Sequence, residues 1–338
     1  MGLRFPRDLA RWQRWQRSQV PLVKRVKQRL QPGAAPTMLL ESPKSPSILV
    51  ALDSWSPTSA LALQAPLEHL PADEVAVLHP GSRSALPALK ATVLDGGREV
   101  PRVLRHVQVV VALGHYLPYG NLAHEWARSL GARFVVVQHG ALTPWMAPLP
   151  EDAVLLAWSA EDAAFWAESR GDVEQRVVGS ELLARAGARR IAHDPAEAPI
   201  FLGQLHGAEL PRHDFARAAE FICRTAGAHY RPHPSEKDLL SRWQHRRWER
   251  RGITIDRSDT PLAQIDRPVV GVFSTGVLEA AARGIPAWVH HPDPPEWLVD
   301  FWSRYRMGRW RESPTPAPAV PTTDPAARVA TTLQELIP

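Results

Sequence analysis

The sequence predicts an α/β protein of two successive domains, each with a parallel sheet and covering helices, and a ligand cleft between them. Short apolar runs of strand length alternate with helical segments along most of the chain, which is the pattern of parallel α/β layers. The length of 338 residues corresponds to about two domains. Hydrophobic residues at 44% and charged residues at 22% are typical of a soluble globular protein.

The chain begins with a basic amphipathic arm and a linker, together residues 1–46. Residues 1–30 contain nine Lys or Arg residues and a single acid. Pro21 interrupts the helical pattern, and a second basic amphipathic piece continues over residues 22–30. Either the arm lies on an anionic membrane surface, or it packs on its own domain and leaves a solvated basic face. The apolar stripe at helical spacing consists of Phe5, Leu9, Trp12 and Trp15.

Charge and cysteine content exclude several classes of protein. The formal net charge of +5 comes from the arm, so the rest of the chain is net acidic and nucleic acid is not an expected partner. The single cysteine, Cys223, excludes a disulfide within the chain and favours a reduced cytosolic setting. No apolar run approaches the roughly 20 residues of a spanning helix. We therefore expect a cytoplasmic protein, peripheral at most at the inner face of the plasma membrane.

The first predicted domain covers residues 47–180. Its apolar runs each end in polar or turn-forming residues, as expected of buried parallel strands. These polar residues include Asp53, His115 and Gln138-His139-Gly140. The expected strands are 48–52, 75–78, 109–113, 133–137, 154–158 and 177–179, and the expected helices are 58–65, 121–130 and 160–168.

The second predicted domain covers residues 199–310, after a connection over 180–198. Residues 311–338 are expected to form a proline-rich tail and a terminal helix. The cluster Arg246, Arg247, Arg250 and Arg251 predicts a solvated helix face. The expected strands are 199–204, 228–230, 253–255, 268–273 and 287–289, and the expected helices are 215–225, 239–250, an Ala-rich helix ended by Gly284, and 296–305.

The turn after residues 268–273 is the strongest candidate for a ligand site. Ser274 and Thr275 offer hydroxyls, Gly276 lets backbone approach a ligand, and the following helix N-terminus favours a phosphate. Glu279 follows about one turn later, within reach of sugar hydroxyls. The alternative is an ordinary parallel-sheet turn in which a hydroxyl caps the helix and Gly284 ends it.

A second motif, Arg231-Pro232-His233-Pro234, follows another strand and should lie at the same carboxyl edge of the sheet, where ligands bind. An Arg, a His, two hydroxyls and a helix N-terminus at one edge form an anion site. Gly203 and Gln204 follow the first strand of the same domain, and we assign them to this nucleotide-binding site together with Pro234.

Three motifs together resemble those of GT-B glycosyltransferases, which have two Rossmann-like domains. More narrowly, they resemble bacterial sialyl-, polysialyl- and Kdo-transferases, whose His-Pro and Ser-Ser or Ser-Thr motifs hold the CMP of the donor. They are also similar to the CDP-glycerol glycerophosphotransferases, which carry a His-Gly motif in the first domain. In many enzymes of this form a last helix returns to the first domain, which 297–306 or 326–337 could do here. The motifs are Val136-Val137-Gln138-His139-Gly140, Arg231-Pro232-His233-Pro234, and Phe273-Ser274-Thr275-Gly276 with Glu279 and Gly284-Ile285-Pro286.

The resemblance implies roles for the donor-site residues. His233 would contact or protonate the leaving phosphate, Ser274 and Thr275 would bind its oxygens, and Glu279 would accept hydrogen bonds from the ribose. A cation together with hydroxyl and amide donors can stabilise the charge that develops on departing CMP. No metal or other cofactor is therefore expected.

His139 is the candidate general base, because inverting transfer needs a group of near-neutral pKa to take the proton of the acceptor hydroxyl. Asp53, after the first strand, and His115 are the alternatives. His115 and Trp145 are also candidates for acceptor binding, since Trp145 follows the His139-Gly140 turn and could stack on a sugar.

We therefore expect a metal-independent inverting glycosyltransferase that moves a CMP-activated sugar, such as a sialic acid or Kdo, to a cell-envelope glycan or lipid-linked acceptor. A CDP-glycerol-type glycerophosphotransferase, a UDP-sugar 2-epimerase and a non-catalytic nucleotide- or glycan-binding protein of an assembly complex are the alternatives. The sequence has no Gly-Lys-Ser/Thr phosphate loop and no Gly-x-Gly-x-x-Gly after its first strand, which disfavours nucleoside triphosphate and dinucleotide chemistry.

Overall fold

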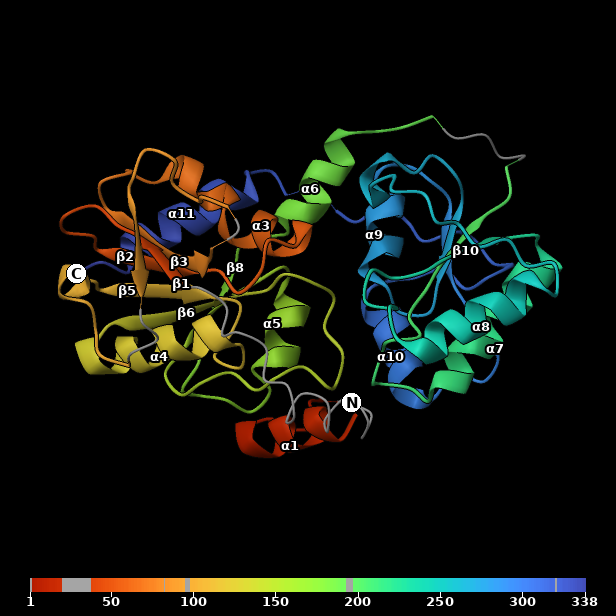
Figure 1. The fold of residues 1–338 in the computed structure, drawn as a ribbon, viewed down its shortest axis with the longest axis horizontal. Coiled ribbons are helices and arrows are strands. Elements are labelled where there is room, and N and C mark those ends of the chain that lie inside the picture. The colour runs from red at the N-terminus through yellow and green to blue at the C-terminus, as the bar shows by residue number, and fades with distance from the viewer. Residues whose placement is uncertain (1, 20–37, 82, 95–97, 193–196, 320) are drawn as a thin grey trace. The chain divides into compact units, whose positions relative to one another are not determined.

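The computed structural model describes residues 2–19, 38–81, 83–94, 98–192, 197–319 and 321–338, and it has the predicted mixed α/β fold. The chain forms two compact units (Figure 1). Residues 2–182 and 321–338 make up the N-terminal unit, and residues 183–320 make up the C-terminal unit.

The N-terminal unit is built on an eight-stranded sheet in the order β4-β1-β3-β2-β5-β6-β7-β8. From β3 to β8 neighbouring strands are parallel, whereas β1 is antiparallel to both β3 and β4. Along the chain, β3 is placed on one side of β2, whereas β5 to β8 are placed in order on its other side, so the strand order reverses between β2 and β5. The strands are β1 (Met38–Glu41), β2 (Ile48–Ala51), β3 (Val75–Pro80), β4 (Ala91–Leu94), β5 (Val109–Ala112), β6 (Arg133–Val137), β7 (Val154–Ala157) and β8 (Glu174–Val177).

Helices cover both faces of this sheet because successive strand residues point to opposite sides. Leu49 belongs to the core beneath α4 and α5, and Val50 belongs to the core beneath α3 and α11. Figure 1 shows α4 and α11 on opposite faces. The helices are α3 (Pro57–Leu63), α4 (Pro118–Leu130), α5 (Ala160–Trp166) and α11 (Pro325–Glu335), with short 3₁₀ helices η1 (Ala65–His69) and η2 (Arg102–Leu104).

Two helices were considered for a return to the first sheet, and the terminal helix, α11, is the one that packs on it. Val329 and Leu333 of α11 are buried in the core that this sheet shares with α3. The other candidate, α10 (Glu296–Arg304), belongs to the C-terminal unit.

The arm forms helix α1 (Leu9–Gln19) and packs on the N-terminal unit. Trp12 is 7% exposed, its indole nitrogen donates to the Trp145 carbonyl at 2.8 Å, and its ring meets the Tyr116 ring at 5.1 Å. The apolar stripe therefore faces the protein, while the arginines among residues 2–19 are exposed. Residues 2–19 thus pack on their own domain and leave a solvated basic face, as in the second of the two interpretations. The second basic piece, residues 22–30, lies outside the described residues.

The C-terminal unit contains a four-stranded parallel sheet in the order β10-β9-β11-β12. Single parallel bridges from Tyr230 to Ile255 and from Val289 to Arg309 extend it at both edges. Figure 1 shows α8 and α9 on opposite sides of the sheet. The elements are β9 (Ile200–Leu202), α7 (Arg212–Thr225), β10 (His229–Arg231), α8 (Leu239–Glu249), η3 (Leu262–Gln264), β11 (Val269–Gly271), α9 (Thr275–Ala282), β12 (Ala287–Val289) and α10.

Several local predictions were wrong. Residues 38–41, predicted as linker, form β1, and β4 was not predicted. Both strands are held by antiparallel pairing with segments distant in sequence, which a local pattern does not reveal. The expected connection contains helix α6 (Glu181–Ala188). The expected strand at 177–179 is displaced to β8, which pairs along β7 at the sheet edge, and the expected strand at 253–255 is reduced to the bridge at Ile255.

Candidate functional site

The carboxyl ends of the parallel strands in the C-terminal unit carry a group of polar residues that are connected by hydrogen bonds. With its two bridging residues, this sheet has the strand order 3-2-1-4-5-6 of doubly wound nucleotide-binding folds. Succession reverses between β9 and β11, and ligands of such sheets bind outside the strand ends at this point. The loops that begin at Gly203 and Val272 therefore flank the expected ligand position.

Gln204 joins these two loops. Its side-chain oxygen accepts hydrogen bonds from the Val272 and Phe273 amides, each at 3.2 Å. Gly203 joins the first loop to β10, because its amide donates to the Arg231 carbonyl at 2.8 Å. A Cβ on Gly203 would lie 2.5 Å from the Tyr230 hydroxyl, so only glycine fits there. Gly203 and Gln204, which were predicted as nucleotide-binding residues, thus hold these loops in position.

Glu236 ties the loop after β9 to the loop after β10, and no motif in the sequence indicates its importance. Its side chain is fully buried and accepts hydrogen bonds from the Tyr230 hydroxyl at 2.9 Å, from His245 Nε2 at 3.0 Å and from the Leu205 amide at 3.0 Å. Burial raises the pKa of Glu236, but its hydrogen bonds, including one from the His233 amide, outweigh burial and hold the pKa at about 2. The carboxylate therefore stays ionised.

His206 and His233 extend from these two loops and stack on each other. Their ring centroids are 3.9 Å apart with 17° between the planes, and both residues are exposed. Nδ1 of His233 accepts from the Ser235 amide at 3.1 Å, so Nε2 carries the hydrogen in the neutral ring. Desolvation and then the charge of His206 lower the pKa of His233 to about 4, so at neutral pH it donates a hydrogen bond but carries no charge.

His206 was missed by the sequence interpretation, although a signal existed. Leu205-His206-Gly207 follows the end of a strand much as Gln138-His139-Gly140 does in the first half. Glu236 offered no comparable signal, because only the packing of β10 and α8 surrounds it with donors.

The Ser-Thr-Gly turn is the N-terminus of α9. Ser274 caps the helix by accepting from the Gly276 amide at 3.1 Å, and Ser274 and Thr275 are both half-buried. Gly276 serves packing, since a Cβ there would lie 2.7 Å from Leu262 and 2.8 Å from Leu202. Glu279 is half-buried, and burial raises its pKa to about 7 despite the opposing charge of Arg283.

The guanidinium of Arg231, predicted as part of the anion site, is bound by other residues of the protein. It binds Asp256 at 2.9 Å, the Ser258 hydroxyl at 3.2 Å and the Thr260 carbonyl. The pair holds the segment after Ile255 against β10. Pro234 is exposed beside His233.

In the N-terminal unit the predicted residues lie at the ends of adjacent strands β2, β5 and β6. Asp53 accepts from the Tyr119 amide at 2.7 Å and the Gly120 amide at 3.0 Å, so it caps α4, whose own N-cap residue supplies no side-chain bond. Burial raises the pKa of Asp53 in spite of these two bonds. Its carboxylate occupies the helix N-terminus at the reversal point of this sheet.

His115 is buried with its ring 5.2 Å from that of His124, and Nδ1 has no partner among the described residues. Burial, then the charges of His124 and Arg170, lower the pKa of His115 to about 4. Trp145 is half-buried and lies under the arm, with the Trp15 ring at 6.4 Å and the Arg4 guanidinium at 5.5 Å.

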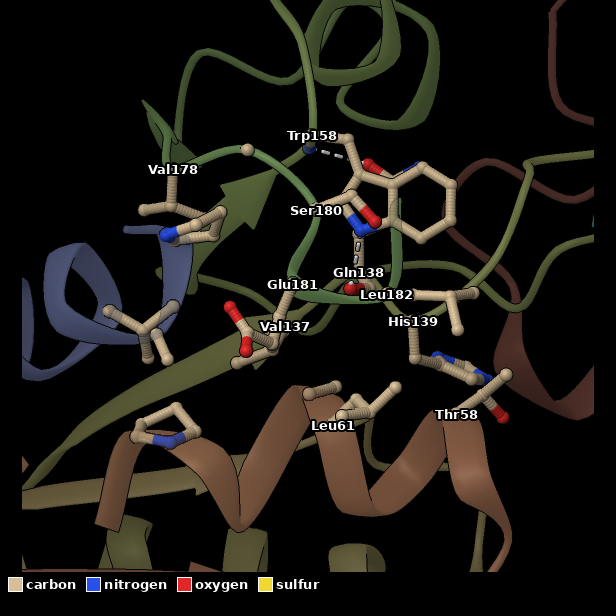
Figure 2. Close-up of a pocket in the computed structure, with 16 residues that line it drawn as sticks. Thr58, Leu61, Val137, Gln138, His139, Trp158, Val178, Ser180, Glu181 and Leu182 are labelled. Carbon is tan, nitrogen blue, oxygen red and sulfur yellow. Dashed lines mark hydrogen bonds between the residues drawn. The ribbon is translucent and has the colours of Figure 1, made fainter. Parts of the chain in front are cut away.

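His139 lies at the edge of a narrow pocket beside Thr58 of α3 (Figure 2). The preceding Gln138 is fixed by the Trp158 amide at 2.8 Å and by Asp162 at 2.7 Å, which sets the backbone at His139. Burial lowers the pKa of His139 to about 4, and its buried Nδ1 has no partner among the described residues. The pocket, of about 20 Å³, has space for a single water molecule.

No protein-family model and no curated protein match this sequence. Among the described residues, no group of three or more His, Cys, Asp or Glu is arranged to hold a metal ion. In the part of the chain that the structure describes, no helix has the length and apolar character needed to cross a membrane.

Proposed function

We propose that the protein is a metal-independent inverting glycosyltransferase of GT-B type, whose C-terminal unit binds a cytidine-nucleotide-activated sugar. The supporting observation is that the loops after the three adjacent strands β10, β9 and β11, tied by Gln204 and Glu236, bring the stacked His206 and His233 to the same sheet edge as the N-terminus of α9. This edge lies at the reversal point of a sheet with nucleotide-binding strand order.

The donor phosphate would lie against the N-terminus of α9, where the amides and the hydroxyls of Ser274 and Thr275 favour an anion. His233 would donate from Nε2 to a phosphate oxygen, since its neutral ring carries the hydrogen there. Glu279, about one turn along α9, would bind the ribose hydroxyls. Arg231 would contribute indirectly, because its guanidinium binds Asp256.

In the N-terminal unit, His139 is the proposed general base. A pKa of about 4 leaves the imidazole neutral near pH 7, so it can accept a proton from an acceptor hydroxyl of an envelope glycan or lipid-linked sugar, but it is a weaker base than the near-neutral group expected from the sequence. Asp53 is a weaker candidate because both of its oxygens accept backbone amides.

A non-catalytic nucleotide-binding protein is the second candidate. It is favoured by the small volume of the pocket beside His139 and by the commitment of Asp53 to capping α4. The donor site would be the same in both cases.

The testing experiment has two stages. A thermal-shift series with CMP, CDP, UMP, UDP and GDP ranks the nucleotides, because a ligand that binds only the folded state raises the melting temperature. We expect the cytidine nucleotides to give the largest shifts, and equal or larger shifts with UDP would contradict the cytidine assignment. Mass detection of the products then separates the candidates: a glycosyltransferase releases CMP from a CMP-sugar and transfers the sugar to the acceptor, a glycerophosphotransferase releases CMP from CDP-glycerol and transfers glycerol phosphate to the acceptor, and a non-catalytic binder does neither.

A further inference from the structure

The outward face of α8 exposes three large apolar side chains. The exposed fractions are 77% for Leu239, 59% for Leu240 and 58% for Trp243, whereas the inward face of the helix is buried. Large apolar groups that gather on one exposed face often mark an interaction surface. The inward residues are Ser241, Gln244, His245 and Trp248.

Cations surround this apolar face. The Arg247 guanidinium lies 5.5 Å from the centre of the Trp243 ring. The two acids of the segment are engaged: Asp238 caps the helix through the Ser241 amide at 2.9 Å, and Glu249 pairs with Arg257. Cations outnumber these two acids, so the face is net positive. Its exposed cations are Lys237, Arg242, Arg246, Arg250 and Arg251, of which Arg251 also pairs with Glu220 at 3.3 Å.

We propose that this α8 face, defined by Leu239, Leu240 and Trp243 with the surrounding cations, docks onto an anionic lipid bilayer. Leucines enter the boundary between headgroups and acyl chains, Trp stays at headgroup level, and arginines pair with lipid phosphates. The surface is distinct from the arm, whose apolar stripe packs on the N-terminal unit. It is also independent of the proposed catalytic activity.

Charge decides between a bilayer and a second copy of the chain. Two copies meeting through this face would bring together two sets of arginines, and like charges repel at contact. A bilayer with anionic lipid offers negative charge over its whole surface together with an apolar interior. It therefore complements both components of the α8 face.

The experiment uses the full chain with vesicles of phosphatidylcholine containing 30% phosphatidylserine, and with vesicles of phosphatidylcholine alone. Cosedimentation compares the wild type with the triple variant Leu239→Ser, Leu240→Ser, Trp243→Ser. Val93→Ser, at a residue 61% exposed on β4, is the matched control. Because all four positions are exposed, melting temperatures should be unchanged, which verifies folding.

We expect the triple variant to lose roughly tenfold or more in its partition coefficient on the anionic vesicles, and Val93→Ser to match the wild type. Any binding through the arm is common to all these proteins and cancels in the comparison. Wild-type binding should fall as salt rises from 0.1 to 0.5 M. Equal partition of wild type and triple variant would overturn the proposal.

Fluorescence quenching by nitroxide-labelled lipid gives a second measurement. Wild type should be quenched more than Trp243→Phe, because Trp243 is the indole placed at headgroup depth. Equal quenching in the two proteins would contradict insertion of this face. A concentration-dependent dimer in sedimentation velocity that the triple variant abolishes would also overturn the proposal, because the face would then bind a second copy.

Discussion

The imidazole rings of His206 and His233 stack with their centroids 3.9 Å apart. The two residues come from loops after different strands, and the buried carboxylate of Glu236 holds both loops. The lowered pKa of His233, about 4, means that the pair does not carry two positive charges near pH 7. The pair is thus a fixed hydrogen-bonding surface at the predicted donor site.

Substitution of the two predicted catalytic histidines should produce different defects. His139→Ala should bind CMP nearly normally and lose about 100- to 10,000-fold in turnover, because a general base acts in the chemical step. His233→Ala should lose both CMP affinity and turnover, because a phosphate contact acts in binding as well. Calorimetric titration with CMP and a steady-state assay measure the two effects. Near-normal turnover in His139→Ala would transfer the base role to Asp53 or His115.

Activity should persist in EDTA. The proposed phosphate contacts are the amides at the start of α9, two hydroxyls and the Nε2–H of His233, which neutralise developing charge without a metal ion. Turnover before and after dialysis against chelator measures this. Complete loss, restored by added divalent cation, would contradict the metal-free mechanism.

Glu236→Gln should lower the free energy of unfolding by about 3 kcal/mol, because it removes a buried ionised acceptor and leaves several donors short of a partner. Its folded pKa of about 2 is below the ordinary value, so the stabilisation is present above about pH 4.5 and is lost as pH falls toward 2. Urea unfolding at pH 7 measures the loss. Glu312→Gln, at an exposed position of the same unit, is the control and should change little.

Glu279 should have the opposite pH dependence. Its pKa of about 7 in the folded protein exceeds the ordinary value, so the folded state binds more protons between about pH 4.5 and pH 7. Its contribution to stability therefore falls as pH rises through this window. The difference between wild type and Glu279→Gln isolates it from the titrating histidines, and a pH-independent difference would contradict the raised pKa.

Trp12→Ala should destabilise the N-terminal unit by about 3 kcal/mol, because a buried indole and its hydrogen bond to the Trp145 carbonyl are lost. The exposed Gln16→Ala is the control on the same helix. Thermal or urea unfolding measures the difference. Equal stability of the two variants would mean that the arm does not pack on the unit in solution.

The sequence by itself determined the alternation of strands and helices, because buried parallel strands require apolar runs and helices require their own spacing. It also placed His233, Ser274 and Glu279 after strands or at a helix start, since these positions follow from local pattern. Strands β1 and β4 were not predicted, because their hydrogen bonds come from antiparallel pairing with segments distant in sequence.

Only the tertiary structure decided how the polar residues are used. Arg231 and Asp53 look from the sequence like free site residues, yet they bind Asp256 and the amides of α4. In the sequence, Glu236 is an ordinary acidic residue of a turn. In the folded protein, β10 and α8 bury it and supply its hydrogen-bond donors. The physical reason is that hydrogen-bond partners and desolvation depend on neighbours in space, and these set both the availability and the pKa of a polar side chain.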